Sequence, residues 1–460
     1  MYVIPVSQQV SIQKNQTLIT DIYAEELLGY YTYKIHYEGR DRLLIIYGDN
    51  GSGKTTLLKL VYHLLSTESN QGHKSALANV RFKTISVTLS NGIIIMAKRN
   101  DNNKGPFVLS IKSLIDKELD YRAIVRTAEQ NGALTVSNSE SEDNPAYGKV
   151  ISLIKNLGIS LYFLQDDRDL LTASANKRKI INSTQLEKRL RKEVLYNISQ
   201  IDESKKSKQK FLIEEAFDTF NDWIKAKVIT FSSIGESNNQ SIYFDLIKSI
   251  SASAGFNDLN PTNNSELLGQ LEEISILNQS LANIGLVTSF DYLSLINIIR
   301  QTEGYEKLML IQNVLTPFIE GATAKLNALS EIYNIITLFI SNINDYFFDK
   351  VMRYSLSEGF SVLHHNGDIV QMSELSSGEK HLLHLWINSI IAEDATIFII
   401  DEPEISLNIK WQRRLLDSLL SYTQARNIQF VIATHSIELL ANNMDSVVKL
   451  VNSDSVFKND

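Results

Sequence analysis

The sequence predicts an α/β fold in which a mostly helical middle separates two strand-rich ends. Apolar runs at 42–48, 395–400 and 428–434 are short and bounded by turn residues, as buried parallel strands are. Asn-Gly pairs at 91–92 and 366–367 stand between apolar runs and predict two hairpins. Between the ends, apolar residues recur at helical spacing.

The helical middle suggests that one domain is split by an insertion. Its clearest helical repeat places an apolar residue every four positions, at Leu186, Leu190, Val194 and Ile198. We expect residues 1–147 and 351–460 to form one α/β domain, with a helical insertion at 148–350. The polar segment 128–147 is expected to be a loop, and Pro317 is expected to divide the helical region.

Composition indicates a globular protein. The chain has 460 residues, of which 43% are hydrophobic, so it is too long for one ordinary core. It contains no cysteine, which excludes disulfides and cysteine-ligated metals. The first residues lack the pattern of a signal peptide, and no apolar run reaches the roughly 18 residues of a membrane span. We therefore expect a cytoplasmic protein with no membrane partner.

Charge gives no reason to expect general binding to nucleic acid, because the net charge is −8. One stretch differs: residues 177–210 hold eleven Lys and Arg against four acids. Such a run is usually a solvated helix face. It could instead be a patch for nucleic acid or for an acidic protein, and the sequence leaves both interpretations open.

The strongest chemical motif is "GDNGSGKTT" at 48–56, which spells Gly, four residues, Gly-Lys-Thr between a strand and a helix. Its glycines let backbone N–H groups converge on phosphate oxygens at a helix N-terminus. Lys54 is expected to reach the β- and γ-phosphates, and the Thr55 hydroxyl to ligate Mg²⁺. The predicted nucleotide-binding residues are Gly48, Asn50, Gly51, Ser52, Gly53, Lys54, Thr55 and Thr56.

A second motif, "IFIIDEPE" at 397–404, ends a buried strand with acids. Ligands bind at the carboxyl ends of such strands. Asp401 would hold Mg²⁺, and Glu402 would polarise the attacking water, as hydrolysis of a phosphoanhydride requires. Taken alone, the motif could also be an acidic turn.

A third motif, "FVIATHS", places His435 at the end of another apolar strand. A lone histidine is more often structural than catalytic. We expect this strand to neighbour the one that ends in Asp401, where a neutral imidazole could hydrogen-bond the γ-phosphate.

The fourth motif is "LSSGE" at 375–379, just ahead of an apolar helical pattern. Taken in their order along the chain, with "LSSGE" second, the four motifs resemble those of ABC-type ATPases, in the branch that contains Rad50, SMC proteins, RecF and the AAA-named ATPases of bacterial defence systems. The resemblance implies an ABC-type ATPase head, with a mixed sheet and a phosphate-loop core, that uses ATP and Mg²⁺ and hydrolyses ATP. It further implies that Ser376 and Gly378 grip the γ-phosphate bound to another protomer, so that ATP joins heads into a homo-oligomer, a dimer or a multiple of dimers.

Two departures from transport ATPases point to the defence and RecF-like branch. About 320 residues separate the phosphate loop from "LSSGE", and Asn408 stands where transport ATPases carry aspartate. The family has a glutamine loop that contributes to nucleotide and metal binding, and the sequence leaves open which residue corresponds to it. The segment "LYFLQDDRDLL" offers Gln165, with Arg168 as a second phosphate-facing candidate.

Within that branch the chain most resembles stand-alone anti-phage ATPases, the AriA component of PARIS or the PtuA component of Septu. The 25 residues after His435 leave no room for a Toprim nuclease, and no His-Asn-His pattern occurs. The resemblance thus implies a sensor or scaffold that controls a separate effector, a Toprim or HNH nuclease, after contact with a phage trigger protein. Nucleic acid is not required as a partner.

Two other interpretations remain open. One is a RecF-like repair ATPase that clamps DNA through residues 177–210. The other is a degenerate ATPase kept as a structural part, against which the intact Lys54, Asp401 and Glu402 argue.

Overall fold

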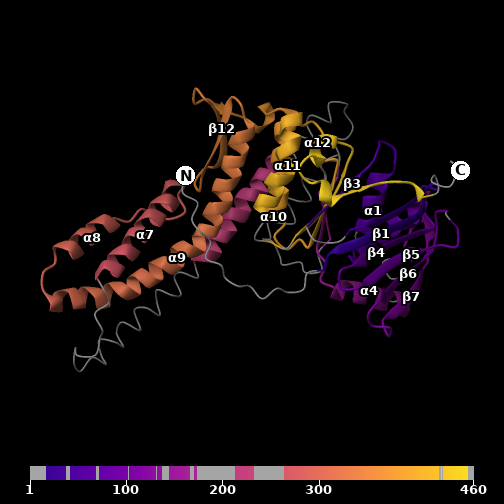
Figure 1. Cartoon of the computed structure of the whole chain (residues 1–460), viewed down its shortest axis with the longest axis horizontal. Coiled ribbons are helices and arrows are strands. Elements are labelled where there is room, and N and C mark those ends of the chain that lie inside the picture. Colours follow the sequence, from indigo (N-terminus) through magenta and orange to yellow (C-terminus); the bar gives the residue numbers. More distant parts are fainter. Residues whose placement is uncertain are drawn as a thin grey trace. The chain divides into compact units, whose positions relative to one another are not determined.

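The computed structural model describes residues 17–37, 42–68, 72–101, 103–130, 132–136, 144–165, 170–173, 213–232, 264–423, 426 and 428–453. They form two compact units (Figure 1). A helical unit lies within Lys210–Leu375, and a sheet-containing unit is formed by Gln9–Gln209 and Ser376–Asp460. The basic stretch 177–210 and the second glutamine-loop candidate, Arg168, lie outside the described residues.

The first sheet of the sheet-containing unit is almost entirely parallel, with the order β11-β10-β15-β16-β3-β17. Its strands are β3 (Leu43–Tyr47), β10 (Leu161–Leu164), β11 (Leu170–Ala173), β15 (Ile397–Asp401), β16 (Gln429–Thr434) and β17 (Val447–Lys449). Only the β10–β11 pair is antiparallel. Every residue of β15 and β16 is buried, which explains why these strands read as unbroken apolar runs.

The second sheet is antiparallel, with the order β2-β1-β4-β5-β6-β7. Its strands are β1 (Ile19–Leu27), β2 (Tyr31–His36), β4 (Thr84–Leu89), β5 (Ile93–Lys98), β6 (Phe107–Ser113) and β7 (Asp120–Val125). The predicted hairpin at Asn91-Gly92 is confirmed, since β4 pairs with β5 and Gly92 has a φ of 78°.

One helix links the two sheets. Helix α1 (Lys54–Leu65) packs against β10, β15 and β16 of the first sheet and against β1, β4 and β5 of the second. A helix covered on both sides has to be apolar nearly all round, and eight of its 12 residues are buried. Buried Gln429 adds a polar link, because its side-chain amide exchanges hydrogen bonds of 2.7 and 2.9 Å with the backbone of Ile19.

The segment 128–147 is not the continuous loop expected from its polarity. Strands β8 (Ala128–Gln130) and β9 (Ala133–Thr135) form a small hairpin, and α4 (Pro145–Asn156) begins within the segment. Asn79, the last residue of α2 (His73–Asn79), exchanges two hydrogen bonds with the backbone of Leu134. Side-chain to backbone bonds of this kind leave no apolar periodicity in the sequence.

The helical unit contains a helix over 213–232, α7 (Asn264–Asn283), α8 (Tyr292–Gln301) and α9 (Tyr305–Tyr346). Pro317 does not divide the region, because it lies inside α9. Strands β12 (Lys350–Ser355), β13 (Gly359–His364) and β14 (Ile369–Val370) follow, and the predicted Asn366-Gly367 hairpin is confirmed by the β13–β14 pairing. The described helices include none that is both long and apolar enough to cross a membrane.

The predicted fold class is confirmed: an α/β unit with a mixed set of sheets is interrupted in the chain by a helical unit. The unit boundaries differ from the predicted 148–350. Helix α4 packs on β6 and β7, and β10 pairs with β15, so both belong to the sheet-containing unit. Strands β12–β14 group with the helices, up to Leu375.

Candidate active site

The predicted site residues gather because three neighbouring parallel strands end at one edge. Strand β16 lies between β15 and β3, with Asp401 paired to Ala433 and Thr434 paired to Tyr47. The expectation that the His435 strand neighbours the Asp401 strand is therefore confirmed. The carboxyl ends of parallel strands are where open α/β sheets bind ligands.

The loop that follows β3 adopts the backbone its glycines allow. Gly51 and Gly53 have φ values of 81° and 79°, in the left-handed region that L side chains rarely adopt. Gly53 is the N-cap of α1, so the first N–H groups of this helix, which have no acceptor within the helix, point toward the loop. Thr55 and Thr56 occupy the first turn of the helix and are partly buried.

Two tyrosines that the sequence reasoning missed hold this loop. The Tyr33 hydroxyl donates to the Ser52 carbonyl at 2.7 Å, and the Tyr31 hydroxyl donates to the Gly51 carbonyl at 3.1 Å. The two rings stack with centroids 5.6 Å apart. The sequence contains one sign of this pairing: the two tyrosines are two residues apart on a strand, which puts both side chains on the same face.

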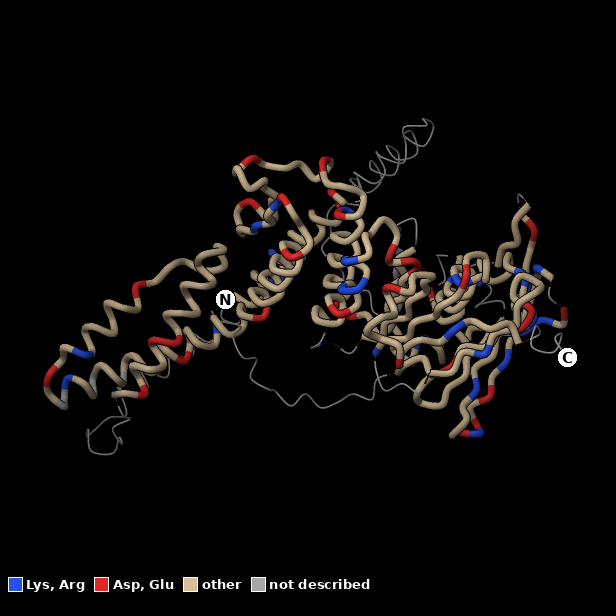
Figure 2. Tube along the Cα trace, turned by 45° about the horizontal axis from the view of Figure 1, so that its top comes forward, with Lys and Arg blue, Asp and Glu red and all other residues tan. Residues whose placement is uncertain are grey.

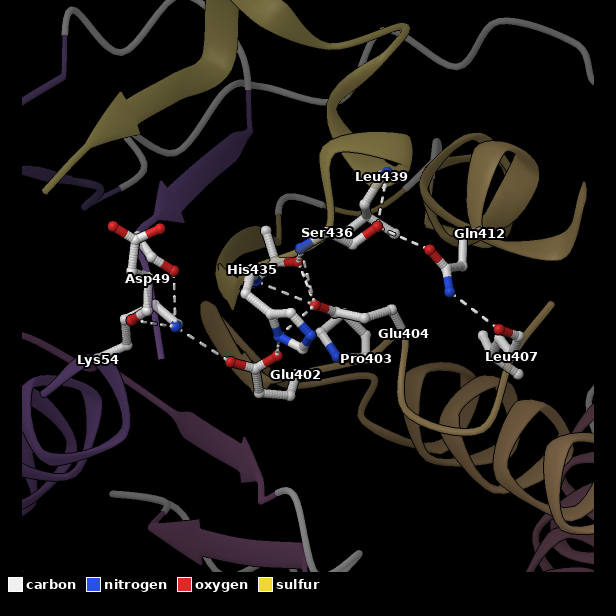
Figure 3. Close-up of polar contacts among 12 residues, drawn as sticks. Asp49, Lys54, Glu402, Pro403, Glu404, Leu407, Gln412, His435, Ser436 and Leu439 are labelled. Atoms are coloured by element: carbon white, nitrogen blue, oxygen red, sulfur yellow. Dashed lines mark hydrogen bonds and ion pairs between the residues drawn. The ribbon is translucent and has the colours of Figure 1, made fainter. Parts of the chain in front are cut away.

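Lys54 is buried, with 5% of its surface exposed. Its Nζ donates to the carbonyls of Gly48 at 2.8 Å and Asp49 at 3.2 Å, and lies 3.3 Å from Glu402 Oε1 (Figure 3). The cation is thus placed by the backbone of its own loop and faces the acidic end of β15.

The opposite end of α1 is held by a second buried lysine. Lys74 Nζ donates to the carbonyls of His63, Leu64 and Ser66, at 2.8 to 2.9 Å. A cation at this end complements the helix dipole, while burial lowers the pKa of Lys74 to about 7. The contact fixes the helix on which Lys54 stands.

The acids at the end of β15 lie in different surroundings. Asp401 is buried, with 1% of its surface exposed. Glu402 has a φ of 49°, and its N–H donates to the Ala433 carbonyl at 2.9 Å. This left-handed turn directs Glu402 so that one carboxylate oxygen faces Lys54 and the other bonds His435 Nδ1 (Figure 3).

Glu404 is a further buried acid that the sequence reasoning did not single out, although it is the second glutamate of "DEPE". Its Oε1 accepts from the Thr434 hydroxyl and from the N–H groups of His435 at 3.1 Å and Ser436 at 3.2 Å. Burial, followed by the neighbouring Glu402, raises the pKa of Glu404 to about 7.

The donors at this edge fit a divalent cation bound with a phosphate. Thr55 and Asp401 offer a hydroxyl and a carboxylate, the oxygen ligands that Mg²⁺ prefers. Gln165 follows β10, and since Leu164 pairs with Ile400, it leaves the sheet beside Asp401. Glu402, Glu404 and His435 also lie close together, with one polar atom of each within 4.8 Å of the others. Glu404 Oε1 already accepts three hydrogen bonds and His435 Nδ1 bonds Glu402, so we read this group as a hydrogen-bonded cluster and not as cation ligands.

Ser376 and Gly378 lie at the start of α10 (Ser377–Ile391) and not at these strand ends. Ser376 is the N-cap: its hydroxyl accepts from the Glu379 N–H at 3.2 Å, and Glu379 Oε2 accepts from the Ser376 N–H at 2.7 Å. This capping box explains the Ser-x-x-Glu spacing without a ligand. At Gly378 a Cβ would come within 2.5 Å of the Ser406 carbonyl oxygen, so only glycine fits.

Comparison with known families identifies the chain. Residues 43–441 match the family model described as "AAA domain, putative AbiEii toxin, Type IV TA system". The chain belongs to this family of AAA ATPase domains. The match begins at β3 and runs past His435, so it includes both segments that build the candidate site.

The other comparisons add little. No curated protein matches the chain. Among solved structures it is similar to the SMC head domain with an extended coiled coil bound to the C-terminal domain of ScpA from Pyrococcus furiosus, at 16% identity and a TM-score of 0.36, covering 96% of this chain and 98% of that one. The SMC head domain from Thermotoga maritima is similar at 11% identity and 0.31, covering 94% and 95%. Scores this low carry no argument about function.

Replacing Lys54 with alanine is expected to abolish measurable ATP binding, because the variant loses the cation that the loop aims at the acidic edge. Equilibrium titration with ATP and Mg²⁺ measures this. Lys59→Ala, on the same helix, is the matched control and should bind as the parent does. Equal affinity of Lys54→Ala and the parent would remove Lys54 from the site.

Proposed function

We propose that this protein binds ATP with Mg²⁺ at the carboxyl edge of its parallel sheet, hydrolyses it between paired heads, and thereby controls a separate effector nuclease in bacterial defence against phage. One observation carries the ATPase part of the proposal. Lys54, at the start of α1 after the loop that follows β3, and Glu402 and His435, directly after β15 and β16, form one chain of contacts.

Each residue in that chain has a role in hydrolysis. The N–H groups at the start of α1 and the Lys54 ammonium bind the β- and γ-phosphates. Thr55 and Asp401, with Gln165 beside them, would hold Mg²⁺, which neutralises phosphate charge. Glu402 accepts the proton of the attacking water. The bond from His435 Nδ1 to Glu402 orients the imidazole ring and leaves Nε2 to contact the γ-phosphate.

The contact between Lys54 and Glu402 suggests how substrate and base are coupled. The Lys54 ammonium lies 3.3 Å from Glu402, and both side chains are largely buried. A bound phosphate would compete for the same ammonium and release Glu402 to act on water. Binding would then assemble the catalytic arrangement.

Pairing of heads is proposed from the position of Ser376. This residue is exposed at the N-terminus of α10, where N–H groups and the helix dipole favour an anion. A two-fold pair would place Ser376 and Gly378 of one chain on the ATP of its partner, and reciprocally. Pairs could join further into a multiple of dimers.

The defence role is supported by the family description, which names the AbiEii toxin and a type IV toxin–antitoxin system, and by the resemblance to AriA and PtuA. We propose a Toprim or HNH nuclease as the effector, a phage protein as the trigger and the cytoplasm as the location. The DNA-clamp alternative rests on residues 177–210, which lie outside the described residues, while the described antiparallel sheet carries charges of both signs. Lys and Arg are interspersed with Asp and Glu on the antiparallel sheet (Figure 2), and Arg122 pairs with Asp120 at 2.9 Å.

Glu402→Gln is expected to bind ATP but to lose turnover by at least about 100-fold, because an amide cannot accept the proton. Steady-state phosphate release, measured beside ATP titration, separates the two effects. Turnover near that of the parent would exclude Glu402 as the base.

Ser376→Arg is expected to bind ATP while losing both ATP-dependent pairing and hydrolysis, because a bulky cation cannot fit at a shared phosphate site. Co-expression with Lys54→Ala sharpens the test. A mixed pair joins the intact loop of the Ser376→Arg chain to the intact Ser376 of the Lys54→Ala chain, so partial hydrolysis should return.

Light scattering and phosphate release on the purified mixed assembly measure the outcome. Normal hydrolysis by Ser376→Arg alone would contradict the shared site. Mixed pairs that form without any hydrolysis would show either that both sites must act together or that Ser376 does not act across the pair.

A further inference from the structure

We infer that Glu404 is a positioning residue for ATP hydrolysis: its buried carboxyl group fixes the loop that begins at the end of β16 and so sets the His435 ring against Glu402. The inference rests on the proposed function and names a residue to which that function assigns no role. Glu404 does not need to touch ATP, because it acts through His435.

The carboxyl group joins two strand ends. One oxygen, Oε1, accepts from three donors on the β16 side: the Thr434 hydroxyl and the N–H groups of His435 and Ser436. Glu404 itself follows β15, two residues after Glu402. Because β15 and β16 are neighbours, this single oxygen ties the turn that carries the base to the loop that carries the histidine.

The same loop is fixed from its other side. The Ser436 hydroxyl donates to Gln412 Oε1 at 2.6 Å, and Gln412 Nε2 donates to the Leu407 carbonyl at 2.9 Å (Figure 3). Ser436 also caps α12 (Ile437–Leu440). His435 alone extends from this framework, with 44% of its side chain exposed, while the Glu404 side chain is 4% exposed. A buried framework that holds one accessible imidazole is the arrangement expected of a positioning shell.

The protonation state of Glu404 gives the role a measurable signature. Its second oxygen, Oε2, is buried and takes none of the three donors that bond Oε1. The adjacent titratable groups are Glu402 and His435; farther out, Lys54 contacts Glu402 from α1, and His381 of α10 bonds the Pro403 carbonyl.

Burial raises the pKa of Glu404 to about 7, so the carboxyl is neutral below that pH and ionised above it. In the neutral state it can share its proton with Glu402. In the ionised state two carboxylates repel each other beside His435. We expect the neutral form to hold the catalytic arrangement, because it avoids this repulsion, so hydrolysis should weaken as the pH rises through about 7.

Two substitutions of Glu404 distinguish a role in positioning His435 from a role in stability alone. Glu404→Ala removes the acceptor and should lower kcat by about 10-fold or more, as a displaced catalytic group does, while ATP affinity stays within about 2-fold. Glu404→Gln keeps an acceptor for the N–H groups and stays neutral. It should retain most of the activity and lose the decline above pH 7.

The experiment measures ATP titration, kcat and thermal melting from pH 6 to 8.5 for the parent, both Glu404 variants, Glu402→Gln and Glu438→Gln. Glu438 pairs with Arg413 at 2.7 Å outside the cluster, so Glu438→Gln is the matched control and should behave as the parent. A ratio of Glu404→Gln to parent activity that rises with pH supports the inference.

The failure of this inference can be told from the failure of the proposed function. If the parent hydrolyses ATP and Glu402→Gln does not, the proposed function stands. Parental kcat in folded Glu404→Ala, loss of ATP binding in that variant, or equal alkaline declines in Glu404→Gln and the parent would then each overturn the role of Glu404. If Glu404→Ala does not fold, the pH profile of Glu404→Gln decides alone. A parent without ATPase activity overturns both.

Discussion

The parallel pairing of β3, β16 and β15 is the constraint on which the rest of the candidate site depends. Residues that are far apart in the sequence, such as Lys54, Glu402 and His435, meet because three strands end at the same edge. A buried sheet fixes these ends, since its backbone hydrogen bonds have no alternative partners in the core. Helix α1, covered by both sheets, then fixes the loop that carries Lys54.

Within this frame, the site balances opposite charges on Lys54 and Glu402, both of which are largely buried. The Lys54 ammonium faces carbonyl oxygens and Glu402, and Glu402 in turn bonds His435. Glu404 adds a second carboxyl that burial keeps neutral up to a pH of about 7. In the proposed mechanism an incoming triphosphate takes the Lys54 ammonium from Glu402, which would link binding to catalytic readiness.

Much of the fold and the centre of the site could be predicted from the sequence. Unbroken apolar runs identified the buried strands, Asn-Gly pairs identified both hairpins, and glycine spacing identified the loop before α1. The sequence failed where backbone contacts, and not apolar periodicity, set the structure. Asn79 holds β9 in a segment that looked like a loop, and Glu404 accepts hydrogen bonds from backbone N–H groups, which leave no pattern in the sequence. The sequence also could not show that α4 and β10 belong to the sheet-containing unit, because this depends on their tertiary contacts with β6, β7 and β15.

The most direct test of the central claim is an experimental structure of the parent protein with Mg²⁺ and an ATP analogue that cannot be hydrolysed. The account predicts that the triphosphate lies on the N–H groups at the start of α1, with Lys54 Nζ moved from Glu402 to a phosphate oxygen and Glu402 facing a water. A nucleotide bound elsewhere, or a Lys54 that keeps its contact with Glu402 while the site is filled, would contradict it.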